Sequence, residues 1–310
     1  MKTYPGLNVV MYHYILKNNK FGNFKLKSLN IDKFIDQLTS ISKKSKIISP
    51  EEFRFKLEKK YKFNNEFILT FDDGYKCHYE IVKKVLDLKK IKGFFYPTCY
   101  PYKYKKLLDI NQIHLILSAE KNSEKLLNFI MNYLKLNHLK IYLKIKSNLN
   151  QIKKYKTYDD EKTMIIKRLL QSHLPKKIKS KILKILFNKI LNETDINLIN
   201  NFYLNINEIK KLHDEGHEIG LHGFNHNRYE FQNLSEQKND FNKSKIFWSK
   251  ILKNKNNWSI CYPFGSYNNL TKKLLKKDNI KFAFTTKKGS NLNPYSNNLE
   301  LKRWDTNDLF

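Results

Sequence analysis

The chain has 310 residues, with 59 Lys and Arg against 29 Asp and Glu, which gives a formal net charge of +30. This length allows one large domain with an insertion, or two domains. The lysines are spread over the whole chain and accompany many Asn and Ile residues, which indicates a general compositional bias rather than a binding patch. We therefore expect no nucleic-acid partner, and we leave open a peripheral association with anionic membranes.

The sequence shows no pattern typical of export or of membrane spanning. The first apolar run is interrupted by Pro5 and contains the polar His13, unlike a secretion signal, and no apolar stretch is long enough to cross a bilayer. Cys77, Cys99 and Cys261 are isolated and odd in number, which argues against a disulfide framework. We expect a cytoplasmic protein and make no prediction of its oligomeric state.

Short apolar runs alternate with helical patterns over the first hundred residues. The expected order is a strand at 7–14, a helix at 31–41, strands at 46–48 and 67–71, a helix at 81–88 and a strand at 93–97. Ser49, Pro50 and Glu52 match the capping box of a further helix. Such alternation predicts βα units arranged in a parallel sheet or barrel.

The character of the chain changes between residues 103 and 203. Apolar residues there have helical spacing, as at Leu126, Ile130 and Leu134, whereas strand patterns and glycines are lacking. We predict an all-helical insertion at 103–203 within a barrel domain formed by 1–102 and 204–310.

The βα pattern resumes after the insertion. The expected elements are a helix at 206–215 closed by Gly216, a strand at 217–222, a helix from Ser235 to Leu252, a strand at 258–262, a helix at 270–277, and strands at 282–286 and 299–304. About eight strands therefore lie outside the insertion, which predicts an α/β fold.

Two adjacent carboxylates, Asp72 and Asp73, follow the strand at 67–71. Carboxylates at the end of a buried strand are costly unless they meet a metal, a proton or a cation. Because neighbouring side chains on a strand point in opposite directions, the pair suits two tasks, such as holding a metal and moving a proton. The alternative is a simple Asp-Asp-Gly turn that ends the strand.

His222 and His226 are four residues apart in LHGFNH, where another strand is expected to end. Two imidazoles at this spacing can reach one ion if the backbone turns, and two surface histidines in a loop are the alternative. The carboxyl ends of barrel strands share one face, so both carboxylates, both histidines, His13 and the turn at 261–265 are expected there. A His₂-Asp set with open positions is typical of a catalytic metal site.

Three motifs in this order, TFDDGY (70–75), GHEIGLHGFNH (216–226) and YPFG (262–265), resemble those of the polysaccharide deacetylases with a NodB-homology domain, carbohydrate esterase family 4. The resemblance covers residues 1–100 and 205–310. It implies a distorted (β/α) barrel of seven or eight strands and hydrolytic removal of acetyl groups from sugars.

The resemblance also implies roles for individual residues. Asp73, His222 and His226 match the ligands of a divalent ion, most often zinc, with cobalt and nickel as alternatives. Asp72 matches the general base. The backbone N–H of Phe264, where the family usually has tyrosine, would stabilise the oxyanion.

Two features depart from the usual family pattern. Many relatives begin the third motif with arginine, where this chain has Cys261, and no late histidine is present to act as the acid. The sequence is most similar to the branch with an N-terminal Tyr-His motif and no arginine in the third motif. We therefore assign His13 as an acid or orienting group, with a core histidine as the alternative. Arg303 is assigned as the guanidinium beside Asp72, with a surface ion pair to Asp305 as the alternative.

These residues predict a metal-dependent hydrolase that removes an N-acetyl or related acyl group from a glycan or a sugar-containing precursor. A role in surface-polysaccharide or glycoconjugate biosynthesis follows from the family and the expected compartment. Two other functions stay open: a degenerate barrel that binds sugar without turnover, and hydrolysis of another C–N bond, as in a deformylase.

Overall fold

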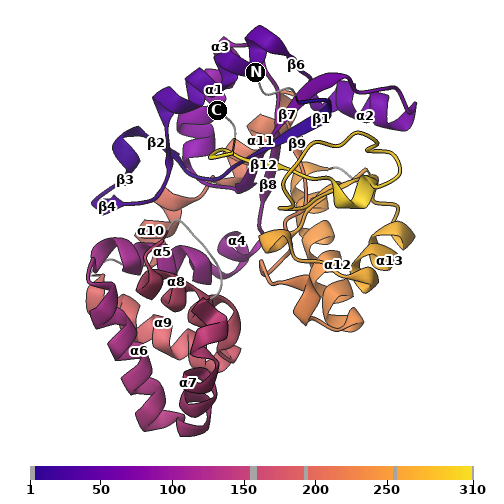
Figure 1. Ribbon diagram of the computed structural model, residues 1–310. Coiled ribbons are helices and arrows are strands. Elements are labelled where there is room, and N and C mark those ends of the chain that lie inside the picture. The colour runs from indigo at the N-terminus through magenta and orange to yellow at the C-terminus, as the bar shows by residue number, and fades with distance from the viewer. Residues whose placement is uncertain (1–3, 154–158, 192–194, 254–256, 309–310) are drawn as a thin grey trace. The chain divides into compact units, whose positions relative to one another are not determined.

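The computed structural model describes residues 4–153, 159–191, 195–253 and 257–308 (Figure 1). Its contacts divide the chain into two compact units. The first consists of residues 1–19, 27–106 and 196–310, and the second of residues 20–26 and 107–195. The domain boundaries at 103 and 203 stay a prediction.

Parallel strands close into a ring in the first unit. The main ladder runs in the order β12–β1–β7–β8–β9, formed by Trp304–Asp305, Gly6–Tyr12, Asn65–Asp73, Phe94–Pro97 and Glu218–Ile219. A separate parallel pair consists of β10 (Ile260–Cys261) and β11 (Ala283–Phe284). Bridges from Leu221 to Ile260 and from Phe284 to Leu301 join this pair to both ends of the ladder. The predicted distorted α/β barrel is therefore confirmed.

The longest ladder in the barrel joins β1 and β7, which are paired from Gly6 opposite Asn65 to Tyr12 opposite Phe71. Every residue of β1 is buried, because a parallel strand is covered on both faces. Phe71 stacks between Tyr12 and Phe95, with ring centroids 5.2 and 4.7 Å away. β6 (Lys46–Ile47) pairs with the beginning of β7, outside the ring.

Helices follow most of the barrel strands. They are α1 (Ile31–Lys44), α2 (Pro50–Glu58), a π-helical turn (His78–Lys83) continued by α3 (Lys84–Leu88), α4 (Tyr100–Tyr104), α10 (Asp195–Phe202), α11 (Ile206–Asp214), α12 (Leu234–Leu252) and α13 (Asn269–Lys277). Short strands β2 (Ile15–Leu16) and β5 (Leu29–Asn30) pair beside α1.

Three local predictions were wrong in detail. The capping box of α2 is half formed: the Ser49 hydroxyl accepts the Glu52 N–H, but the Glu52 carboxylate pairs with Lys46 at 2.7 Å. α12 begins after Asn233, which makes a complete capping box, rather than at Ser235. Residues 299–304 do not form one strand, because a 3₁₀ turn at Asn298–Glu300 occupies its start.

Among its described residues, the second unit is helical apart from the antiparallel pair β3 (Lys20–Phe21) and β4 (Phe24–Lys25). Its helices are α5 (Asp109–Ala119), α6 (Ser123–Asn137), α7 (Leu139–Lys153), α8 (Glu161–Arg168) with a π-helical extension (Leu169–His173), and α9 (Lys176–Ile190). Leu126, Ile130 and Leu134 form the buried stripe of α6, as their spacing predicted. Over the described residues of the whole chain, no helix combines the length and apolarity needed to cross a membrane.

Candidate active site

Strand β7 ends with both carboxylates, and both are buried. The backbone of Asp73 has a φ of 71° and that of Gly74 a φ of 74°, so the chain leaves the extended conformation at the second carboxylate. His226 and Phe264 also have positive φ values, 55° and 58°. Left-handed backbone at residues other than glycine is costly and concentrates at functional sites.

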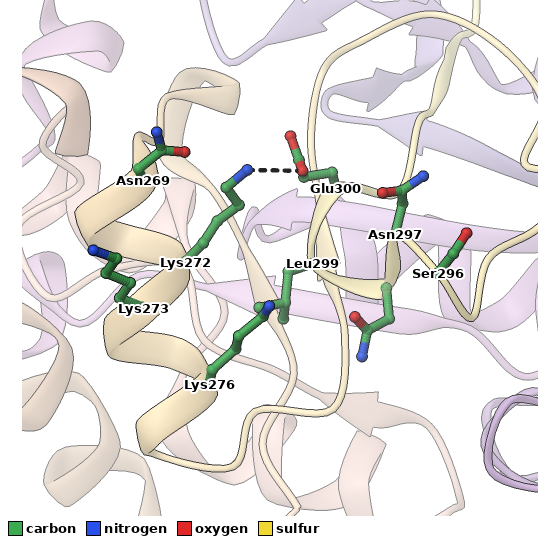
Figure 2. Close-up of a pocket in the computed structure, with 9 residues that line it drawn as sticks. Asn269, Lys272, Lys273, Lys276, Ser296, Asn297, Leu299 and Glu300 are labelled. Atoms are coloured by element: carbon green, nitrogen blue, oxygen red, sulfur yellow. Dashed lines mark hydrogen bonds and ion pairs between the residues drawn. The ribbon is translucent and has the colours of Figure 1, made fainter.

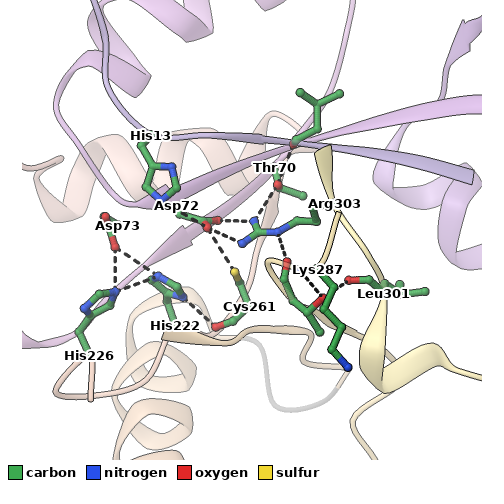
Figure 3. A network of polar contacts seen from close by, with 12 residues as sticks. His13, Thr70, Asp72, Asp73, His222, His226, Cys261, Lys287, Leu301 and Arg303 are labelled. Carbon is green, nitrogen blue, oxygen red and sulfur yellow. Dashed lines mark hydrogen bonds and ion pairs between the residues drawn. The ribbon is translucent and has the colours of Figure 1, made fainter. Parts of the chain in front are cut away.

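Asp73, His222 and His226 direct three atoms at one point (Figure 3). Asp73 Oδ1 lies 3.2 Å from His222 Nε2 and 3.1 Å from His226 Nε2, and the two nitrogens are 3.2 Å apart. Asp73 Oδ1 is buried and makes no hydrogen bond of good geometry to any described residue. Three acceptor-capable atoms therefore form a nearly equilateral triangle in the interior.

The neighbours of this triangle fix how its atoms are presented. His222 Nδ1 is 2.7 Å from the carbonyl oxygen of Cys261, so Nδ1 carries a proton and Nε2 is the ring nitrogen that faces Asp73 Oδ1. The Tyr75 hydroxyl donates to Asp73 Oδ2 at 2.6 Å, which turns Oδ1 toward the histidines. Outer-sphere hydrogen bonds of this kind orient metal ligands in proteins.

The triangle fits a divalent metal ion. Ligand atoms bound about 2.0–2.2 Å from one ion lie roughly 3.0–3.5 Å from each other, which matches the separations of 3.1–3.2 Å found here. One carboxylate oxygen and two imidazole nitrogens are ligands suited to zinc and to similar transition metals. A metal would also satisfy Asp73 Oδ1, which accepts no hydrogen bond of good geometry from the described residues.

The loop between the two histidines is held by Asp240 of α12. Its Oδ2 accepts the Phe224 N–H at 2.8 Å and the Tyr229 hydroxyl at 3.2 Å, and its Oδ1 accepts the Asn225 N–H at 3.0 Å. Asp240 is buried, so these hydrogen bonds are shielded from water. They anchor the backbone from which His222 and His226 extend.

Asp72 makes a second, separate set of contacts. Arg303 binds it through two parallel hydrogen bonds, Nη1 to Oδ1 at 2.9 Å and Nη2 to Oδ2 at 2.8 Å, and the Cys261 thiol lies 3.3 Å from Oδ2. Burial acts to raise the pKa of Asp72, but Arg303, followed by His222 and His13, lowers it to about 2. Asp72 is therefore a carboxylate at neutral pH.

Arg303 itself is fixed by the barrel. Its Nε donates to the Thr285 carbonyl oxygen at 2.7 Å and its Nη1 to the Thr70 hydroxyl at 3.0 Å. Thr70 and Asp72 lie on the same face of β7, because they are two residues apart. With 1% of the side chain exposed, Arg303 is not in a surface ion pair, so that alternative is wrong.

His13 and Phe264 border this cluster. His13 follows β1, and its Nε2 lies 3.8 Å from Asp72 Oδ2 while 41% of its side chain is exposed. It is therefore not a core histidine. The Phe264 ring contacts the His226 ring, with centroids 4.6 Å apart, and the Phe264 N–H makes no hydrogen bond to any described residue.

Comparison with known proteins agrees with this geometry. The family profile described as polysaccharide deacetylase matches residues 148–283, a stretch that contains both histidines and the turn at 262–265. Over that stretch, a little under half of its length, the chain is similar to the polysaccharide deacetylase family. No curated protein sequence matches it.

Several solved structures share the fold of this chain. The Streptococcus pyogenes deacetylase PplD in complex with acetate aligns with 98% of this chain and 93% of its own, at 17% identity and a TM-score of 0.57. IcaB from Ammonifex degensii aligns with 97% and 91%, at 14% identity and a TM-score of 0.57. A de-N-acetylase from Aggregatibacter actinomycetemcomitans aligns with 98% and 97%, at 12% identity and a TM-score of 0.54.

The structure thus brings all seven predicted site residues to one region. These are Asp72, Asp73, His222, His226, His13, Arg303 and Phe264. Their chemical roles stay predictions. Sequence reasoning did not identify Tyr75, Thr70 or Asp240 as contacts of the site. The first two lie in the TFDDGY motif, whereas nothing in the sequence marks Asp240.

A separate surface pocket of about 430 Å³ lies between α13 and residues 296–300 (Figure 2). It is lined by lysines and amides, and Lys272 within it pairs with Glu300 at 3.0 Å. None of its lining residues belongs to the carboxylate–histidine cluster.

Proposed function

We propose that this chain is a metal-dependent hydrolase that removes an N-acetyl group from a glycan or a sugar-containing precursor. The observation that carries the proposal is the triangle of Asp73 Oδ1, His222 Nε2 and His226 Nε2 beside an ionised Asp72. These three residues would hold a divalent ion, most often zinc in this family. A bound ion would polarise the acetyl carbonyl and increase the acidity of a water molecule.

Asp72 is the general base of the proposed reaction. It accepts a proton from the water that attacks the acetyl carbon, and Arg303 keeps the accepting carboxylate ionised and fixed in orientation. Because both Asp72 oxygens are hydrogen-bonded to the guanidinium, the carboxylate cannot rotate away from the water.

Charge develops on the acetyl oxygen as the water attacks. The Phe264 N–H, which bonds to no described residue, would donate to this oxygen. Breaking the C–N bond then requires a proton on the sugar nitrogen. We propose that His13 supplies it, because its Nε2 is close to Asp72 and its side chain is partly exposed. The products are acetate and a free amine.

A biosynthetic role on a surface polysaccharide or glycoconjugate, and a cytoplasmic location, are parts of the same proposal. The biosynthetic role rests on the similarity to the deacetylase family, and the location rests on three cysteines that form no disulfide. The helical region at 103–203 is proposed as an insertion in the deacetylase barrel.

Two carboxamide variants test the proposal. Asp73→Asn removes a charged ligand and should lower both the bound metal and the release of acetate from N-acetylglucosamine oligomers. Asp72→Asn is the matched control, since it changes the adjacent carboxylate in the same way. It should keep the metal and lose at least 100-fold in acetate release. Elemental analysis and an acetate assay measure the two quantities.

Each rival function predicts a different result. A purified wild-type protein that holds no metal after zinc, cobalt or nickel is supplied is a sugar-binding barrel at most. Metal retained without acetate release, together with formate release from N-formyl sugars, would identify a deformylase.

A further inference from the structure

The turn between α6 and α7 carries an exposed patch, consisting of Leu136, Leu139, Leu143, Lys135, Lys140, Lys144 and Lys146. The three leucines are 85%, 55% and 54% exposed. Within the described residues of the second unit, no other large apolar side chain is exposed to this degree. Exposed apolar side chains gathered in one place indicate an interaction site.

The opposite faces of α6 and α7 pack into the core of the second unit. Leu134, just before the patch in sequence, and Ile145, between two of its lysines, are buried, so the three exposed leucines point away from the core of the unit. Leu139 and Leu143 are four residues apart and share one side of α7. Figure 1 shows α6 and α7 as neighbouring helices, and their contacts agree.

The charge of the patch is of one sign. Residues 135–146 contain four lysines and no Asp or Glu, and all four lysines are exposed. We infer that this patch, the α6–α7 tip, binds the surface of an anionic lipid bilayer, with the leucines in the interface and the lysines on lipid phosphates.

The charge also argues against a second copy of the chain as the occupant. A symmetric dimer through the tip would place the lysines of one copy opposite those of the other, and like charges repel. An anionic bilayer complements both the apolar and the basic side chains. This inference does not depend on the proposed catalytic function, because it uses no residue of the barrel.

Sedimentation with lipid vesicles tests the inference in the full-length protein at 0.15 M salt. We expect binding to vesicles that contain phosphatidylglycerol and none to pure phosphatidylcholine. A quadruple Lys→Gln variant of the four tip lysines and a triple Leu→Asn variant of Leu136, Leu139 and Leu143 should each bind at least tenfold more weakly. Circular dichroism checks that the exposed substitutions leave the fold intact.

The matched control changes four exposed lysines elsewhere in the same unit, on α9, to Gln: Lys176, Lys177, Lys181 and Lys184. It removes the same charge and should bind within threefold of the wild type. Equal losses in both quadruple variants would mean that the net charge, not the tip, binds lipid, and would overturn the inference. The inference would also be overturned if the wild type did not bind the vesicles, or if it formed a dimer that the leucine variant abolishes.

A fluorescent label gives a direct readout of insertion. The three native cysteines are buried, so a single introduced surface cysteine can be labelled with an environment-sensitive dye. Leu139→Cys should give a blue shift of emission on anionic vesicles, and Lys181→Cys on α9 should not. Equal shifts at both positions, or no shift at Leu139→Cys, would contradict insertion of the tip.

Discussion

Tyr75 donates its hydroxyl hydrogen to the oxygen of Asp73 that is not directed at the histidines. We predict that Tyr75→Phe lowers metal affinity by about 10- to 100-fold, because the freed carboxylate can rotate. Titration with zinc in a competing chelator measures the change. Tyr12→Phe is the control, since the Tyr12 hydroxyl is buried but bonds to no described residue. Equal metal affinity in Tyr75→Phe and the wild type would refute a positioning role for Tyr75.

The guanidinium of Arg303 holds Asp72 through its planar shape as well as its charge. Arg303→Lys keeps the positive charge but cannot make two parallel hydrogen bonds to Asp72. We predict a fall in kcat of roughly 10- to 100-fold with a much smaller change in KM, because the base is no longer fixed. Steady-state acetate release provides both constants.

A second bidentate arginine offers a control for this prediction. Arg54 binds Glu218 through two hydrogen bonds of 2.6 and 2.7 Å, with no contact to the carboxylate–histidine cluster. Arg54→Lys should therefore leave kcat close to that of the wild type. If both variants lose turnover equally, the effect of Arg303→Lys is a general loss of barrel stability.

Helix α12 supplies the anchor of the histidine loop through Asp240. Asp240→Asn replaces one accepting oxygen with an N–H₂ group that faces backbone and hydroxyl donors. We predict a loss of about 1–3 kcal/mol in unfolding free energy and weaker metal binding, because the loop that carries His222 and His226 loosens. Denaturation with and without zinc measures both effects.

The control for this prediction is Asp278→Asn, which removes the partner of Lys245 at a partly exposed ion pair. Such a pair contributes about 1 kcal/mol or less. Metal affinity unchanged in Asp240→Asn would show that the loop keeps its shape without the anchor.

The strands of the barrel show which parts of the fold could be predicted from sequence. β1, β7 and β8 are continuous buried runs, so their residues indicate strands without any knowledge of their partners. The expected strands at 217–222 and 299–304 are shorter in the structure, since the ladder there is reduced to single bridges at Leu221 and Leu301. Hydrogen-bond pairing of this kind depends on the partner strand and leaves no local pattern.

The residues of the candidate site also fall into those that the sequence indicates and those that it does not. Asp72 and Asp73 were predicted because a buried strand ends at two carboxylates, and His222 and His226 because of their spacing. Arg303 came only from the family resemblance. Asp240 contacts a loop that precedes it by more than a dozen residues. A single carboxylate on an amphipathic helix has the same sequence pattern as a solvated residue, so the sequence alone does not indicate this contact.

At the scale of the whole molecule, acid should destabilise the barrel through His78. This side chain is buried, its Nε2–H donates to the His13 carbonyl oxygen at 2.8 Å, and its Nδ1 bonds to no described residue. Burial lowers the pKa of His78 from 6.5 to about 4, and the charges of Asp72, Asp73 and His13 change it less. Between these two values the unfolded chain binds a proton that the folded chain does not. Stability is therefore lost as the pH falls below 6.5, and the net charge of +30 adds repulsion.

We predict that His78→Gln, whose amide can still donate to the His13 carbonyl oxygen, reduces the loss of unfolding free energy between pH 7 and pH 5 by about 2 kcal/mol. Urea denaturation followed by tryptophan fluorescence reports on the barrel alone, because Trp248, Trp258 and Trp304 all belong to the first unit. His173→Gln is the control, since its side chain is exposed and should leave the acid dependence unchanged. If His78→Gln and the wild type lose equal stability on acidification, His78 already carries its proton in the folded barrel, and the acid sensitivity must originate in other buried groups.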